Sequence, residues 1–140
     1  MRIDHIGYAV RDICQAIKEF RKLGFSFEDI VDDPDRNLYI AFGENGGYRI
    51  ELVSPRNKGG GCSVDHILRR EGNTPYHFCY LSEDLEKDME DLKAARYKVI
   101  VPEAPALAFG GRRVVFLMNL NVGLVEIVEV SKQSRDELRL

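Results

Sequence analysis

The alternation of hydrophobic and polar residues divides this chain into strands and helices that occur twice in the same order. Residues 3–10 have the alternating pattern of a half-buried strand. An amphipathic helix is predicted from the N-cap Asp12 to Leu23-Gly24, because Asp12 with Gln15 forms a capping-box pattern. Short strands at 25–31, 38–42 and 48–53 follow, separated by turn-forming residues at 32–35 and 43–47. The first half of the chain is therefore predicted to be βαβββ.

The second half repeats this order, with a strand at 76–81, a helix at 83–95 and strands at 97–101, 113–117 and 124–130. Equivalent residues keep a nearly constant offset, which is 72 for two landmarks and 75 for the next two, as a single three-residue insertion would give. The four landmark pairs are His5 and His77, Phe25 and Tyr97, Phe42 and Leu117, and Glu51 and Glu126. This constancy predicts two similar units.

We expect an α+β fold in which two tandem βαβββ units, about 1–54 and 75–130, form a curved mixed sheet around a cavity. Together they make one domain over residues 1–130. A Gly-rich connection at 55–61 and a short helix at 63–71 join the units, and residues 131–140 form a polar C-terminal tail.

Composition narrows the function classes. With 44% hydrophobic and 31% charged residues and a net charge of −3, the chain has the balance of a soluble globular protein without a strongly basic surface. We therefore expect a small-molecule partner and neither nucleic acid nor membrane. The sequence starts with strand-like residues rather than a secretory signal, which favours the cytoplasm. The three cysteines lack a close pairing, so neither a disulfide framework nor a thiolate zinc site is indicated.

His5, Glu51, His77 and Glu126 are the candidate metal ligands. They stand at equivalent positions of the two repeats, with 46 residues from His5 to Glu51 and 49 from His77 to Glu126. Carboxylates among apolar strand residues are costly to bury unless they are paired or bind a metal. The alternative is that each histidine is a satisfied core residue and each glutamate points to solvent. Four residues at equivalent positions favour the metal site.

Two imidazoles and two carboxylates suit Co²⁺, Ni²⁺, Zn²⁺, Mn²⁺ or Fe²⁺, and the sequence does not choose among them. Four ligands on a six-coordinate ion leave two adjacent places for the oxygens of a substrate, which would stabilise the charge that forms when a proton next to a carbonyl is removed. Glu126 or Glu51 is then the natural catalytic base. His66 has no counterpart in the other repeat, and we expect it at the surface.

The chain resembles the vicinal oxygen chelate superfamily, which includes glyoxalase I, methylmalonyl-CoA epimerase, extradiol dioxygenases and bleomycin-resistance proteins. The resemblance runs from Ile3 to Glu129. It is most similar to the epimerase branch in its segments Ile3–Val10, Ile50–Pro55, Tyr76–Phe78, Gly110–Leu117 and Gly123–Glu126. The resemblance implies metal ligands at His5, Glu51, His77 and Glu126, and it implies a homodimer.

The chain also departs from these relatives. It has Tyr76-His77 where the epimerases usually have two histidines, and Tyr39 where some have a second catalytic carboxylate. The Asp-Pro-x-Gly turn usual in glyoxalase I is replaced by Asn119–Gly123.

The first hypothesis rests on the four candidate ligands and the epimerase-like segments. It is a metal-dependent isomerase or lyase that removes a proton α to a carbonyl or thioester, similar to methylmalonyl-CoA epimerase.

Three alternatives stay open: a lactoylglutathione lyase of the glyoxalase I type, a non-catalytic binding or resistance module, and a ring-cleaving dioxygenase. In a dioxygenase, the additional carboxylate of Glu51 would crowd the face of the iron that must stay open for oxygen. The substrate would be an acyl-CoA thioester or a glutathione hemithioacetal. Its phosphates or carboxylate could meet cations at Lys58–Gly61 or at Gly110–Arg113, although both segments also fit ordinary solvated turns.

Overall fold

The computed structural model describes residues 1–130, so the predicted tail at 131–140 lies outside the described residues. The fold is mixed α+β, as predicted, with nine strands in the described part. This part divides into two compact units. We call His5–Tyr76 the first unit, and Met1–Asp4 together with residues 77–130 the second unit. The first residues of the opening strand belong to the second unit, and the repeat bounds of about 1–54 and 75–130 stay a prediction.

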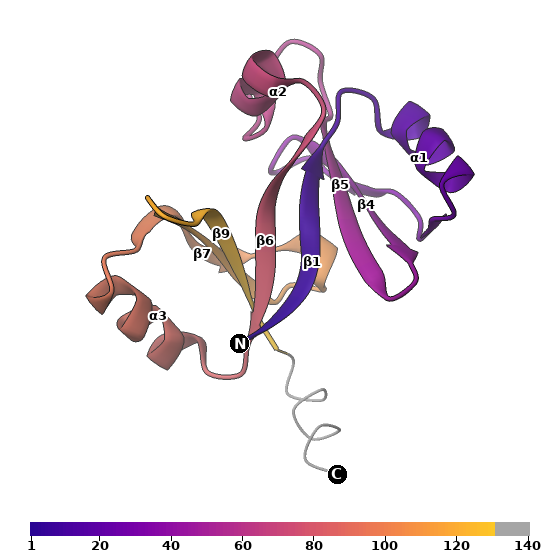
Figure 1. Ribbon diagram of the computed structural model, residues 1–140. Coiled ribbons are helices and arrows are strands. Elements are labelled where there is room, and N and C mark those ends of the chain that lie inside the picture. The colour runs from indigo at the N-terminus through magenta and orange to yellow at the C-terminus, as the bar shows by residue number, and fades with distance from the viewer. Residues whose placement is uncertain (131–140) are drawn as a thin grey trace. The chain divides into compact units, whose positions relative to one another are not determined.

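The first unit combines a mixed sheet with two helices. Its strand order is β2-β4-β5-β1, β3 pairs with β4, and β1 runs parallel to β5. Helix α1 lies along the sheet of β4 and β5, and α2 follows at the end of this unit (Figure 1). The elements are β1 Arg2–Ala9, α1 Ile13–Lys22, β2 Ser26–Phe27, β3 Val31–Asp33, β4 Leu38–Asn45, β5 Tyr48–Pro55 and α2 Asp65–Glu71.

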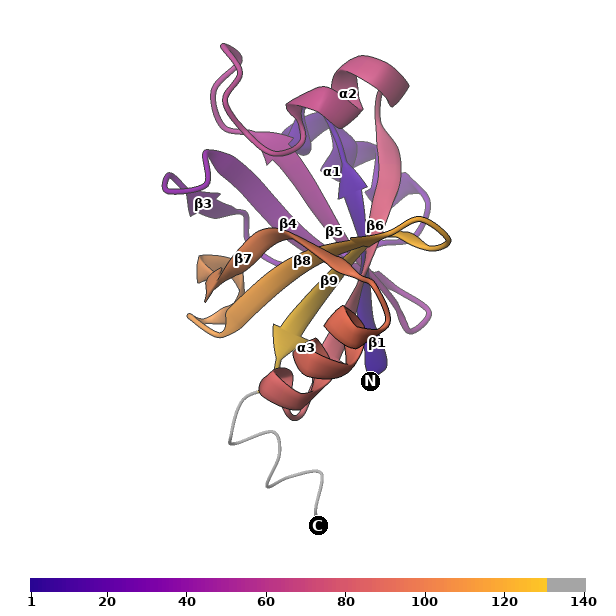
Figure 2. The same ribbon diagram turned by 90° about the vertical axis from the view of Figure 1, so that its left-hand side faces the viewer.

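The second unit repeats this plan with one helix. Its strand order is β6-β9-β8-β7, with β6 parallel to β9 and the other pairs antiparallel. Helix α3 lies beside these strands in the second view (Figure 2). The elements are β6 Thr74–Ser82, α3 Leu85–Ala94, β7 Lys98–Pro105, the 3₁₀ helix η1 Leu107–Phe109, β8 Arg113–Asn119 and β9 Gly123–Glu129.

The two long helices begin in the same way. The Asp12 carboxylate accepts a hydrogen bond from the Gln15 amide at 3.1 Å, and the Asp84 carboxylate accepts one from the Lys87 amide at 3.1 Å. Each bond satisfies one of the amides left without a partner at a helix start. The two caps are 72 residues apart, which is the predicted offset. Helix α1 ends at Lys22 with Leu23 as its C-cap, and Gly24 follows at φ 97°, a backbone conformation that suits glycine.

Each helix covers one face of its sheet and forms the core there. In the first unit the buried residues are Val10, Ile13, Ile17, Ala41, Ile50 and Leu52. In the second unit they are Leu85, Met89, Val115, Leu117, Val125 and Ile127. Because side chains alternate along a strand, the residues between these positions lie on the opposite face of each sheet. The candidate histidines and glutamates are on that opposite face.

The predicted strand at 25–31 is wrong in detail. Only Ser26–Phe27 and Val31–Asp33 form strands. The turn predicted at 32–35 therefore begins two residues later than expected, after Asp33. Buried Asp33 explains the later start, because its carboxylate accepts a hydrogen bond from the Arg36 amide at 3.2 Å and closes the turn back to β4.

In the part of the chain described here, no helix is long and apolar enough to cross a membrane.

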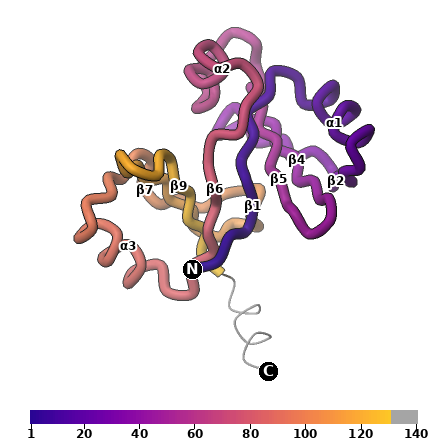
Figure 3. Tube along the Cα trace, in the orientation of Figure 1, coloured from indigo at the N-terminus to yellow at the C-terminus, as the bar shows by residue number. Residues whose placement is uncertain are grey.

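The hairpins β4–β5 and β8–β9 differ in loop length. Asn45 pairs with Tyr48, so the first hairpin has a loop of two residues, Gly46 and Gly47, both with positive φ. Figure 3 shows the tight return between β4 and β5. Asn119 pairs with Gly123, so the second hairpin has three loop residues. One extra residue of the second repeat is therefore in this hairpin.

Candidate metal centre

His5 and Glu51 form a buried pair in the first unit. His5 is 1% exposed and Glu51 is 4% exposed, and the His5 Nε2 atom lies 3.7 Å from Glu51 Oε1. Gly7 is the register partner of Glu51 on the parallel strand β1. Gly7 has no side chain, so β1 contributes none at the register position beside this carboxylate.

His77 and Glu126 form the equivalent pair in the second unit. Both side chains are buried, and His77 Nε2 lies 2.8 Å from Glu126 Oε2. Cys79 is the register partner of Glu126 on the parallel strand β6. Buried Cys79 thus occupies the position of Gly7, and its placement inside a strand is as predicted.

An aromatic ring stands next to each pair. Phe42 lies opposite Glu51 on the antiparallel strand β4, and its ring centroid is 5.5 Å from that of His5 in an edge-on arrangement. Phe116 lies opposite Glu126 on β8, with its ring centroid 5.3 Å from that of His77, also edge-on. Such rings fix the orientation of an imidazole and exclude water from it.

Phe116 corrects the predicted alignment of the repeats. The sequence offsets matched Phe42 with Leu117, but Leu117 faces the helix-side core while Phe116 faces Glu126. The β8–β9 loop is one residue longer than the β4–β5 loop. The offset between equivalent residues of the two repeats is therefore one smaller on β8 than on β9. The signal that could have found both rings is an aromatic residue nine or ten positions before each glutamate.

Two pairs of one imidazole and one carboxylate are a donor set that fits a divalent metal ion of borderline hardness. Burial supports this fit, because an ionised carboxylate at 2–4% exposure needs a cation close by. Within each unit, the structure brings the predicted histidine and glutamate together. The assembly of all four side chains around one ion stays a prediction.

The other residues considered from the sequence lie elsewhere. His66 on α2 is exposed, as expected. Tyr39, at the position where some relatives have a carboxylate, packs against the helix-side core of the first unit and is on the face opposite to Glu51. It is therefore no substitute for the missing acid.

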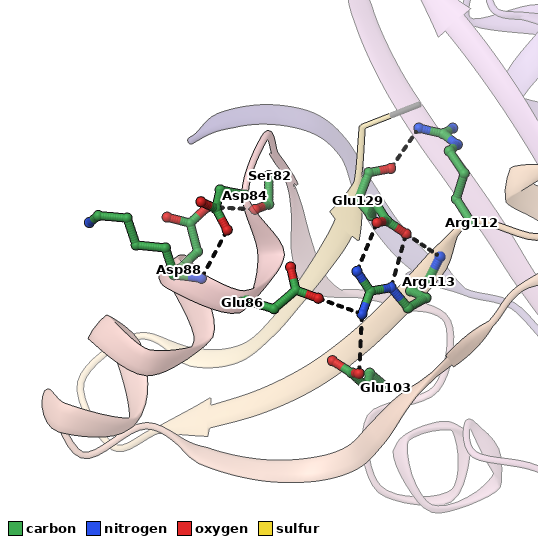
Figure 4. A network of polar contacts seen from close by, with 9 residues as sticks. Ser82, Asp84, Glu86, Asp88, Glu103, Arg112, Arg113 and Glu129 are labelled. Atoms are coloured by element: carbon green, nitrogen blue, oxygen red, sulfur yellow. Dashed lines mark hydrogen bonds and ion pairs between the residues drawn. The ribbon is translucent and has the colours of Figure 1, made fainter. Parts of the chain in front are cut away.

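The predicted cationic loop at Gly110–Arg113 has its arginines engaged within the protein. Figure 4 shows the Arg113 guanidinium among three carboxylates, at 2.8 Å from Glu129 and Glu86 and 3.3 Å from Glu103. Arg112 donates to the Phe109 and Glu129 carbonyl oxygens. The hydrogen bonds that Arg113 donates to the Glu129 and Glu86 carboxylates raise the pKa of Arg113, and the bond to Glu86 lowers the pKa of that carboxyl group. This cluster ties β7, β8, β9 and α3 together, and the three carboxylates balance the charge of Arg113.

Comparison with known proteins identifies the family. Residues 4–116 match the model of the glyoxalase/bleomycin resistance protein/dioxygenase superfamily. An ethylmalonyl-CoA/methylmalonyl-CoA epimerase of Cereibacter sphaeroides is 28% identical over 132 residues, covering 92% of this chain and 98% of the relative.

Solved structures show the same fold. A hypothetical protein from Bacillus halodurans C-125 superposes with a TM-score of 0.82 at 24% identity, over 94% of this chain and 96% of that one. The methylmalonyl-CoA epimerase of Mycobacterium tuberculosis gives 0.79 at 19% identity, over 96% and 91%. A Streptomyces coelicolor epimerase variant in complex with 2-nitronate-propionyl-CoA gives 0.78 at 23% identity, over 94% and 96%. With its repeated βαβββ units and a family match over most of its length, this chain belongs to the glyoxalase/bleomycin resistance protein/dioxygenase superfamily.

Proposed function

We propose that this protein is an isomerase similar to methylmalonyl-CoA epimerase, which exchanges the proton α to the thioester of a malonyl-CoA derivative. The observation that carries the proposal is the repeated, buried histidine–glutamate pair on the sheet face opposite the helices. Support also comes from the relatives, whose names specify ethylmalonyl-CoA and methylmalonyl-CoA as substrates. These thioesters favour acyl-CoA over a glutathione hemithioacetal.

The proposed metal ligands are His5, Glu51, His77 and Glu126, which together supply two nitrogens and two oxygens to one divalent ion. When bound, such an ion supplies positive charge beside the thioester oxygen, where negative charge develops as the α proton leaves. Phe42 and Phe116 keep the two imidazoles in place from the side. Their apolar rings also lower the local dielectric and so strengthen each charge interaction.

Epimerisation requires one group to remove the α proton and another to return a proton to the opposite face of the same carbon. The two repeats supply one carboxylate each. Glu51, at 3.7 Å from its histidine, is held less closely than Glu126 at 2.8 Å, which favours Glu51 as the group that takes up the proton. Glu126 is then the group that returns a proton to the opposite face of the α carbon.

The test is solvent-deuterium incorporation into each epimer of methylmalonyl-CoA separately, with the Glu51→Gln and Glu126→Gln variants. At a metal concentration that saturates each variant, we expect each variant to lose exchange about 100-fold or more from one epimer and to retain it from the other. Glu90→Gln, an exposed change on α3, is the matched control and should exchange both epimers normally. Equal exchange of both epimers in all three variants would contradict the two-carboxylate assignment, and no exchange in the wild-type protein would contradict the epimerase.

We also propose a homodimer in the cytoplasm. Strand β7 is last in the order of its sheet, and its Val99, Ile100 and Val101 are 37%, 54% and 40% exposed. An apolar edge strand of this kind favours association. Light scattering coupled to size-exclusion chromatography measures the mass directly, and Ile100→Lys should shift a dimer toward the monomer.

A further inference from the structure

A cavity lies within the first unit, between the start of α1, helix α2 and the segment 56–61 that follows β5. Its volume is about 940 Å³, which is within the range of small-molecule sites. Tyr39 and Ser54, register partners on β4 and β5, form part of its wall. Figure 2 shows the segment after β5 extending away from the sheet before the chain enters α2.

This cavity is on the other side of the sheet from the His5–Glu51 pair. Ser54 continues the series Ile50 and Leu52, which face α1, whereas Glu51 alternates with it on the opposite face. A ligand in the cavity therefore cannot touch the His5–Glu51 pair through the sheet. The cavity needs an explanation separate from the proposed metal site.

The charge around the cavity is positive although the whole chain has a net charge of −3. The lining contains the cations Arg11, Arg56, Lys58 and Arg69 and the acids Asp12 and Asp65. Both acids are engaged in local structure. Asp12 caps α1, and Asp65 accepts hydrogen bonds from the Cys62 amide at 2.9 Å and the Cys62 thiol at 3.3 Å. These bonds from Cys62, with a smaller effect of Arg69, lower the pKa of Asp65.

Two of the cations are available to a ligand. Arg56 is paired with Asp32 at 2.6 Å, and Arg11 donates to the Leu68 carbonyl oxygen at 2.9 Å. Lys58 and Arg69 are exposed, and the described residues provide neither of them with a hydrogen bond or ion pair shorter than 4 Å. No carboxylate forms an ion pair with either of them in the described part of the chain, although the charge of Arg69 also acts on Asp65.

The segment that carries Lys58 is anchored to the rest of the unit. The Asn37 side chain donates to the Gly60 carbonyl oxygen at 3.4 Å, and Cys62 is tied to Asp65. Gly60 and Gly61 have φ of 91° and 95°, which other residues rarely adopt, so this course of the backbone depends on glycine. The Gly61 and Cys62 amides donate to the Asp65 carboxylate, which holds the segment at the rim of the cavity. Lys58 and Arg69 then line one cavity, and two cations at one cavity are suited to phosphate.

We propose that this cavity binds a phosphorylated small molecule of nucleotide size, with its phosphates at Lys58 and Arg69 and its uncharged part against Tyr39. The site is separate from the proposed metal centre and does not depend on the epimerase proposal. Two sources carry this chemistry, a free nucleotide and the ADP end of a coenzyme A thioester.

The first test is calorimetric titration of the full-length protein with ADP, at low and high salt. We expect the double variant Lys58→Ala/Arg69→Ala to bind ADP at least about tenfold more weakly, since two charge-assisted contacts are lost. Lys93→Ala/Lys98→Ala removes the same charge from exposed positions of the second unit and should bind as the wild type does. Equal affinity in both double variants, or no ADP binding at millimolar concentration, would overturn the proposal.

A second readout uses Cys14, which is exposed and lines the cavity. In a Cys62→Ser background it is the one accessible thiol of the described residues, since Cys79 is buried. ADP should slow alkylation of Cys14 by N-ethylmaleimide several-fold, and adenosine, which lacks phosphate, should not. Alkylation at an unchanged rate under saturating ADP would place the nucleotide elsewhere and refute the site.

The same variants separate the two sources of phosphate and separate this site from the epimerase proposal. If the ADP end of a thioester occupies the cavity, Lys58→Ala/Arg69→Ala raises KM for methylmalonyl-CoA at unchanged kcat, and ADP competes with the thioester. If a free nucleotide is the ligand, ADP binds equally with and without the thioester. In both cases the His5→Ala/His77→Ala variant should retain ADP binding, and its loss there would contradict a separate site.

Discussion

Replacing Glu126 by glutamine should have opposite effects on stability without and with metal. Glu126 is 2% exposed, so its carboxylate is almost fully removed from water. The His77 Nε2 atom lies 2.8 Å from the Glu126 carboxylate, and an imidazole N–H can face a glutamine oxygen as well as a carboxylate oxygen. The glutamine side chain has nearly the same shape as glutamate, so the substitution creates no cavity. It removes a buried charge.

The size of the effect follows from two opposing contributions. Burying a carboxylate costs several kcal/mol, and a close partner offsets part of this cost. We therefore expect metal-free Glu126→Gln to be more stable than the wild type by about 1–2 kcal/mol, which corresponds to about 3–6 °C in Tm for a chain of this length. Metal at about 100 times its Kd should stabilise the wild type by about 2.7 kcal/mol, and the variant much less because a ligand has been lost.

The assay is urea unfolding followed by circular dichroism at pH 8, with EDTA and then with Co²⁺ or Ni²⁺ after chelator removal. Glu90→Gln, an exposed change, should stay within about 0.5 kcal/mol of the wild type in both conditions. The reasoning is refuted if Glu126→Gln is the less stable protein in EDTA, or if metal stabilises the variant as much as the wild type.

Three further predictions concern the supports of the site and the fold. Phe42→Leu should weaken metal affinity about tenfold, measured by competition with a chromophoric chelator, because the ring that orients His5 is lost; unchanged affinity would show that the ring has no such role. Arg113→Met should destabilise the protein at pH 7, and the difference should shrink toward about pH 3. The reason is that Arg113 lowers the pKa of Glu86, so this stabilisation is present above the ordinary pKa of the carboxyl group and is lost as the pH falls; a pH-independent difference in urea unfolding would contradict it. Asp84→Ala should cost about 1 kcal/mol by loss of the α3 cap, and Asp84→Asn, which can still cap, should cost clearly less.

Much of the fold was accessible from the sequence because local signals and tertiary structure agree. The aspartate caps of α1 and α3 are local in the chain, and the helix-facing residues follow the helical period. The pairing of each histidine with a glutamate was predicted from the repeat, since equivalent residues in a duplicated unit occupy equivalent places.

The misses have physical reasons that a single sequence hides. Strand register depends on hairpin loop length, and the extra residue between β8 and β9 made Leu117 look equivalent to Phe42. The turn after β3 depends on which aspartate closes it, and the local sequence does not show that the buried Asp33 accepts the Arg36 amide. The use of Arg113 depends on carboxylates from three other elements, which no local pattern reveals.

The unequal hairpin loops also show where the protein can be altered. Both hairpins place a phenylalanine opposite the glutamate although one loop is a residue longer, so loop length can change without moving these residues. The tip of the longer loop is open to solvent, with Leu120 99% and Val122 60% exposed. An epitope, a fluorophore or a surface-attachment tag inserted between Leu120 and Val122 would therefore report on the protein while leaving Glu126 in its place.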